Sequence, residues 1–132
     1  MIRHAKDMEI EEISNMLGGR KFCNGYVVLT PAEMQGARAF FGRAIMPPGG
    51  SFGFHEQNCR PEGDMEVYYI LSGKAMAYEE DHVEELGPGD VFLCPNGLWN
   101  GLKNHGDEDL WFLSILLHRN PAHDPAEAGA EG

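Results

Sequence analysis

Cysteine, basic side chains and long apolar runs are all scarce in this sequence. The three cysteines are widely spaced and form no CxxC pair, which argues against a disulfide scaffold and fits a reducing compartment. The longest apolar stretch, residues 110–117, is far too short to span a bilayer. The N-terminus lacks the apolar segment of a secretory signal. We therefore expect a cytoplasmic protein without a membrane partner.

Basic residues are outnumbered by acidic ones. Ten Lys and Arg stand against 21 Asp and Glu, which gives a formal net charge of −11. Such a surface repels phosphate backbones, so we expect no nucleic acid partner. Part of the acidic excess lies at residues 79–85, where it predicts a solvated hairpin. The length of 132 residues fits one domain with its own core.

Turn-forming residues are frequent, with 17 glycines and eight prolines. Between them lie short segments rich in aromatic and β-branched residues. They predict strands at residues 25–29, 37–46, 51–55, 66–73, 74–78, 90–94 and 110–117. This pattern is typical of an all-β sandwich or barrel. Segments 37–46 and 110–117 are apolar on both faces, so something must cover both faces, and we expect a homodimer.

Two short helical turns are expected near the N-terminus. Thr30 is suited to cap the first, Pro31 fits the first helical position, and Glu33 completes a capping box. Gly36 would end that turn. Residues 9–17 predict the second. Prolines and small or charged residues fill 120–132, which predicts a flexible tail after a domain of residues 1–119.

Two glycine-bounded motifs appear in the middle of the chain. The first consists of Gly49, His55, Gln57, Glu66 and Gly73. The second consists of Gly89, Pro95, Gly97, Asn100 and Asn104. Together they resemble the motifs of the cupin superfamily over roughly residues 38–117. The resemblance implies a single-domain jelly-roll β-barrel of about six to ten antiparallel strands.

The resemblance also implies where a metal would sit. In the family, the positions of His55, Gln57, Glu66 and Asn100 supply three histidines and a glutamate to a divalent metal such as Mn, Fe, Ni or Zn. Here two of the histidines are replaced by amides, so the implied metal is weakly held or absent. The spacing from Gln57 to Glu66 is longer than in the family, which implies a loop insertion at residues 58–61.

Residues two apart on a strand point to the same face. His55 is therefore expected to share a face with Gln57 and with two small residues, Ser51 and Gly53, which leave room near the site. The aromatic residues at positions 52 and 54 are expected to point away from it.

On the next long strand, Glu66 and Tyr68 share a face by the same rule. If the two faces meet inside a barrel, Glu66 converges with His55, Gln57 and Asn100.

Two functions remain open from the sequence. As an enzyme, the barrel would use Glu66 and His55 as acid and base, or a metal, in isomerase, lyase or dioxygenase chemistry on a small polar substrate. As a binding module, it would hold a small polar metabolite or a sugar through Arg43, Gln57, Tyr68 and Asn100.

The replacement of two histidines favours the binding module, whereas the retained glutamate is consistent with an enzyme. Each residue also has a purely structural alternative. His55 fits a hydrogen-bonded core histidine, and Arg43 fits a surface side chain.

Overall fold

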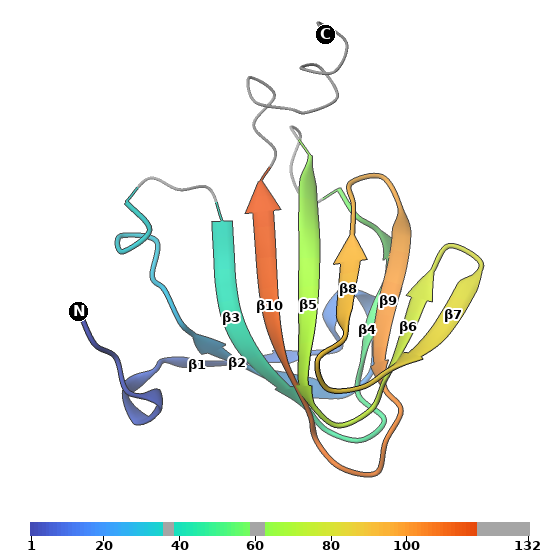
Figure 1. Cartoon of the computed structure of the whole chain (residues 1–132), viewed down its shortest axis with the longest axis horizontal. Helices are drawn as coiled ribbons and strands as arrows, with labels where there is room; N and C mark the ends of the chain where they lie inside the picture. Colours follow the sequence, from blue (N-terminus) through green and yellow to red (C-terminus); the bar gives the residue numbers. More distant parts are fainter. Residues whose placement is uncertain (36–38, 59–62, 119–132) are drawn as a thin grey trace, which may run out of the picture.

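The computed structural model describes residues 1–35, 39–58 and 63–118. It contains ten strands in two antiparallel sheets, and the predicted all-β jelly roll is confirmed (Figure 1). Along the six-stranded sheet the order is β1 (Ile10–Ser14), β2 (Phe22–Val27), β3 (Ala39–Met46), β10 (Leu110–His118), β5 (Asp64–Ser72) and β8 (Val91–Cys94). Along the four-stranded sheet it is β4 (Ser51–Glu56), β9 (Trp99–Asn104), β6 (Ala75–Glu79) and β7 (His82–Leu86).

Two short 3-10 turns, η1 (Ala5–Asp7) and η2 (Met16–Gly18), are the only helical elements assigned in the described residues. No helix in this part of the chain has the length and apolar character needed to cross a bilayer. The predicted tail at 120–132, most of the predicted insertion and Gly36 lie outside the described residues.

All seven predicted strands are present, and three further strands were missed. The prediction of a helical turn at residues 9–17 is wrong over Ile10 to Ser14, which pair with β2 as a strand. Only Ile13 of this strand is partly buried, so its sequence lacks the alternation that marks a half-buried strand. β9 contains two asparagines and a glycine, residue types that are depleted in strands. β7 lies in the predicted acidic hairpin with β6.

The predicted capping box is present, although the segment after it is a turn rather than a helix. Thr30 N donates to Glu33 Oε1 at 2.8 Å, and Glu33 N donates to Thr30 Oγ1 at 3.3 Å. The Arg3 guanidinium binds both carboxylate oxygens of Glu33 and also Val28 O. Hydrogen bonds from Arg3 and then from Thr30 lower the pKa of Glu33 to about 2. The N-terminal segment is thereby tied to this turn.

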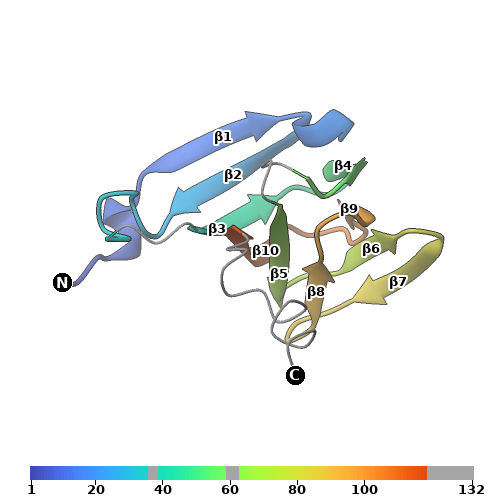
Figure 2. The ribbon, with the colours of Figure 1, turned by 90° about the horizontal axis from the view of Figure 1, so that it is seen from above.

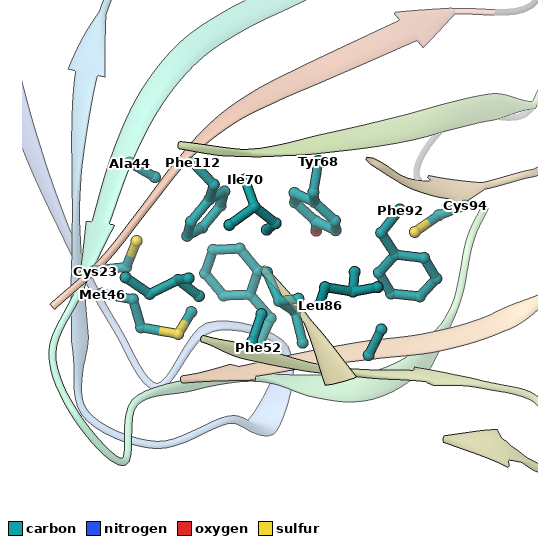
Figure 3. Close-up of a cluster of buried hydrophobic side chains, with 14 residues drawn as sticks. Cys23, Ala44, Met46, Phe52, Tyr68, Ile70, Leu86, Phe92, Cys94 and Phe112 are labelled. Carbon is teal, nitrogen blue, oxygen red and sulfur yellow. The ribbon is translucent and has the colours of Figure 1, made fainter. Parts of the chain in front are cut away.

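Aromatic side chains from both sheets meet in the core (Figure 3). The ring of Phe52, from the four-stranded sheet, lies 5.9 Å from that of Tyr68 and 5.8 Å from that of Phe112, both on the six-stranded sheet. The expectation that Phe52 points away from the site is therefore wrong. The pairing of β4 with β9 shifts register between Phe52 and His55, so residues three apart face inward together. Phe54 is exposed, as expected.

The two sheets are also joined at their edges, where η2 and the residues after it lie against β4 (Figure 2). A Cβ atom on Gly53 would lie 1.8 Å from Leu17 O, and one on Gly19 would lie 1.9 Å from Ser51 O. Ser51 N donates to Arg20 O and Arg20 N donates to Ser51 Oγ, each at 2.9 Å. This contact brings backbone against backbone and requires glycine at both positions.

Replacing Gly53 by alanine should lower the free energy of unfolding by about 1–3 kcal/mol, because the new methyl group collides with the Leu17 carbonyl. Urea denaturation followed by circular dichroism measures this loss. Gly87→Ala is the matched control, since a Cβ there meets no atom within 4 Å. Equal stability of the two variants would contradict the close contact.

Candidate functional site

Three of the four residues expected at the metal position lie at one end of the four-stranded sheet. His55 on β4 is directly opposite Asn100 on β9. Gln57 follows β4, and its backbone is held by hydrogen bonds with Leu98 O at 2.9 Å and Gly97 N at 2.8 Å. The side chains of Gln57 and Asn100 are buried, with 0% and 1% exposure. The strand pairing therefore sets His55 and two buried amides next to one another.

A chain of hydrogen bonds orients the two amides. Gln57 Nε2 donates to Asp64 Oδ1 at 2.9 Å, and Asn100 Nδ2 makes a longer contact of 3.4 Å to Gln57 Oε1. A carboxylate only accepts hydrogen bonds, so Gln57 must turn its NH2 group toward Asp64, and its carbonyl oxygen then accepts from Asn100. Its far end is Asn100 Oδ1, which is buried and has no hydrogen-bond partner in the described part of the chain.

His55 presents a second buried acceptor. Its Nδ1 lies 2.8 Å from Gly53 O, and since a carbonyl only accepts, the nitrogen is the donor. In the neutral imidazole this leaves Nε2 with a free lone pair. Nε2 is buried and also lacks a partner among the described residues. The paired strands β4 and β9 thus each carry a buried acceptor that lacks a hydrogen-bond partner among the described residues.

Glu66, on β5, supplies the carboxylate of the site. Its Oε1 accepts a hydrogen bond from Ser114 Oγ at 3.0 Å, and the hydroxyl of Tyr68 also bonds to it. Burial raises the pKa of Glu66 above its ordinary value. The bonds from Tyr68 and Ser114 oppose that rise, as does His55 whenever its ring carries a proton, whereas the charge of Asp64 adds to it. The fourth expected residue is therefore electrostatically coupled to His55.

Tyr68 lies in the core, where burial raises its pKa well above 10 and keeps its hydroxyl a donor. Arg43 lies elsewhere. Its guanidinium carbon is 4.5 Å from the centre of the Tyr26 ring and 5.2 Å from that of Trp111. By strand alternation this is the opposite face of β3 from buried Ala44. Among the other expected site residues, Arg43 shares the wall of a cavity only with Glu66.

Sequence reasoning missed two residues of the site, Asp64 and Ser114. Both left a signal. Asp64 lies two residues before Glu66 on the same strand, and alternation places the two on one face. Ser114 is the single polar residue of an otherwise apolar segment, 110–117, which is unusual for a buried strand unless the hydroxyl has a partner.

The donor atoms of the site do not fit a tightly bound transition metal. His55 Nε2 is a lone imidazole nitrogen, and Asn100 Oδ1 is a neutral amide oxygen. Within the described residues, no group of three or more His, Cys, Asp or Glu side chains is arranged to hold a metal ion. Imidazole and carboxylate donors are the ones that such metals select, and amides are poor substitutes.

The chain is similar to known proteins along most of its length. The family model of the cupin domain matches residues 42–116. An oxalate-binding protein of Thermotoga maritima is 31% identical over 117 residues, which are 89% of this chain and 93% of the relative. The crystal structure of a predicted oxalate decarboxylase from Thermotoga maritima has a TM-score of 0.80 at 30% identity, covering 90% of this chain and 100% of the other.

The polyketide cyclase RemF of Streptomyces resistomycificus has a TM-score of 0.70 and covers 96% of this chain and 91% of its own. Its identity is 21%, so this likeness concerns the fold alone.

Replacing Glu66 by glutamine should change how stability depends on pH. Because its pKa is raised in the folded protein, the acid contributes stability that is complete below 4.5 and is lost as pH rises through the higher folded value. Glutamine carries no charge, so the stability of the variant relative to the wild type should rise as the pH rises above 4.5 and through the raised pKa of Glu66. Urea unfolding across this range measures the difference.

The groups that face Glu66 are Tyr68 on its own strand, Ser114 and the Cys94 thiol on the neighbouring strands β10 and β8, and His55 on β4 of the other sheet, with Asp64 nearby. Glu12→Gln, at an exposed position on β1, is the control and should show no such trend. A difference between Glu66→Gln and wild type that stays flat with pH would contradict the raised pKa.

Proposed function

The chain belongs to the cupin domain family, and from that premise we propose that it binds a small organic molecule in its barrel instead of a tightly held metal. The observation that carries the proposal is the pair of buried acceptors, His55 Nε2 and Asn100 Oδ1, which find no hydrogen-bond partner among residues 1–35, 39–58 and 63–118. A buried polar atom without a hydrogen bond is destabilising. Donor groups of a ligand, such as hydroxyls of a small metabolite or a sugar, would satisfy both atoms.

The charges of the site select the ligand further. The Glu66 and Asp64 carboxylates lie beside the two acceptors, so a dianion such as the oxalate in the name of the Thermotoga maritima relative would be repelled without a cation. Neutral ligands, or cationic ones, face no such penalty. We therefore expect no direct binding of oxalate to the wild-type protein.

Catalysis is the second candidate. Glu66 combines a raised pKa with coupling to His55, whose Nε2 is free to take up a proton. Such a pair is suited to acid–base work on a bound substrate. An isomerase, lyase or dioxygenase that depends on a metal would in addition need the nitrogen donors that Gln57 and Asn100 do not supply.

Elemental analysis of the protein, purified without added metal, should find well below one equivalent of Mn, Fe, Ni or Zn. The double substitution Gln57→His with Asn100→His should then raise metal affinity by at least about tenfold, because it adds two imidazole nitrogens beside His55. Isothermal titration with Mn²⁺ and Ni²⁺ measures the gain.

The matched control is Asn24→His with Val83→His, which adds two histidines on β2 and β7, neither of which pairs with β4. A stoichiometric metal in the wild type would refute the binding proposal and favour the metal-dependent enzyme. No gain in the double variant over this control would contradict the convergence of the four residues.

We also propose that two copies pair through the outer face of the six-stranded sheet. The apolar pairs Tyr69 with Val91 and Val67 with Leu93 lie side by side on β5 and β8. Tyr69, Val91 and Leu93 are 40%, 46% and 52% exposed in the single chain. Apolar patches of this kind on a soluble protein mark interaction surfaces, and a second copy presents the same patch.

Light scattering should therefore give the mass of a dimer for the wild type and of a monomer for Val91→Lys, since the charge would be buried at the interface. Val83→Lys is the matched control. Val83 is 52% exposed on β7 of the other sheet, so this variant should remain dimeric. A monomeric wild type at high concentration would end the proposal.

A further inference from the structure

A cavity of about 270 Å³ lies on the concave side of the six-stranded sheet, apart from the amide pair. The β1–β2 hairpin and η2 form one side, and β3, β5 and β10 form the other. Apolar side chains make up most of its wall, among them Ile13, Met16, Leu17, Cys23, Phe40 and Leu116. Its volume lies between the roughly 150 Å³ that holds a benzene molecule and the roughly 300 Å³ where drug-sized pockets begin.

Two glycines, which carry no side chain, create the space. Gly25 on β2 is paired with Ala44 on β3, so a side chain at position 25 would point to the same face as buried Ala44 and enter the cavity. Gly42 is the second gap, where a Cβ would lie 2.9 Å from the Phe40 ring. An apolar space of this size, left empty, forfeits packing contacts and lowers stability. A ligand that fills it restores those contacts.

Two polar residues that are hydrogen-bonded to each other lie within the apolar wall. Glu66 and Ser114 line the cavity together, with Ser114 Oγ donating to Glu66 Oε1. A carboxyl group has further lone pairs, so Glu66 is able to accept one more hydrogen bond from inside the cavity. Glu66 therefore offers a polar anchor in a largely hydrophobic space.

The charge around the cavity is negative. Glu11 lies on the cavity side of β1 and is exposed to solvent, where it adds a second carboxylate to that of Glu66. Arg43 also borders the cavity, but its guanidinium is held over the Tyr26 and Trp111 rings. A ligand with a carboxylate of its own would therefore be repelled, and a sugar would leave most of its hydroxyls unbonded against the apolar wall.

We propose that the cavity binds a neutral phenol with one ring, whose ring packs between the hairpin and the sheet and whose hydroxyl donates to Glu66. The aromatic rings of Phe40 and Phe52 in the wall favour a planar aromatic guest. This inference goes beyond the proposed function, because the phenol would fill a cavity apart from His55 and Asn100 and would leave their two acceptors to the ligand proposed above. The residue common to both is Glu66, which lines the cavity and is electrostatically coupled to His55.

The test uses 4-ethylphenol as the probe, titrated into the wild-type protein by calorimetry. We expect saturable binding, with ethylbenzene at least about tenfold weaker because it lacks the hydroxyl donor, and no binding of 4-ethylbenzoate. Equal affinity for 4-ethylphenol and ethylbenzene would refute the anchoring role of Glu66. Absence of saturable binding of 4-ethylphenol would refute the proposal as a whole.

Gly25→Val fills the cavity from β2 and should weaken binding of 4-ethylphenol by more than about tenfold. Valine is favoured in strands, and a Cβ at position 25 meets only Glu11 O at an ordinary 3.7 Å, so the variant should fold. Gly87→Val is the control, outside the cavity, and should bind as the wild type does. Unchanged affinity in a folded Gly25→Val variant would place the phenol elsewhere.

A second measurement needs no variant. In methyl-labelled wild-type protein, 4-ethylphenol should give intermolecular nuclear Overhauser effects to Ile13, Met16 and Leu116, and their absence despite binding would refute the assignment to this cavity. Metal content is determined on the same sample. It bears on the proposed function alone, whereas the phenol contacts bear on the cavity, so failure of one is distinguished from failure of the other.

Discussion

The close approach of η2 to β4 is the contact on which the rest of the molecule depends. A strand pair can be joined by many side chains, but here two backbones meet, and Gly19 and Gly53 are the residues that permit it. The contact holds the connection between β1 and β2 against the four-stranded sheet. Both the enclosed core around Phe52 and the cavity beside it follow from that closure.

Closure also decides the electrostatics of the interior. Water is removed from around Glu66, and the hydroxyls of Tyr68 and Ser114 replace it only in part, so the carboxyl group holds its proton more firmly. The barrel offers lone pairs at His55 and Asn100, and Glu66 also lines an apolar space. A guest inside the barrel would thus meet hydrogen-bond acceptors and a carboxyl group, a combination that differs from a site built to hold a metal and an acid.

The resemblance of the two motifs to those of cupins predicted the barrel and the placement of His55, Gln57 and Asn100 near one another, because the glycines and Pro95 at the family's positions keep the backbone that presents these side chains. It did not predict that Phe52 faces inward, since a register shift inside a strand leaves no mark in the residue alternation. The exposed strand β1 was missed because it buries almost nothing. The cavity was beyond sequence reasoning because its wall combines residues far apart in the chain, from Ile13 to Leu116, whose proximity only the fold establishes.

The hydrogen bonds from Asn100 to Gln57 and from Gln57 to Asp64 both point the same way, and the acceptor-only carboxylate of Asp64 sets that direction. An asparagine at position 64 would be able to donate as well as accept, and both amides could then turn over without losing a bond. The atom shown to a guest would change from the oxygen of Asn100 to its nitrogen. The residue at position 64 therefore determines, through two hydrogen bonds, which atom of Asn100 faces a ligand. Relatives with identical pocket walls but a different residue at this position need not share a ligand.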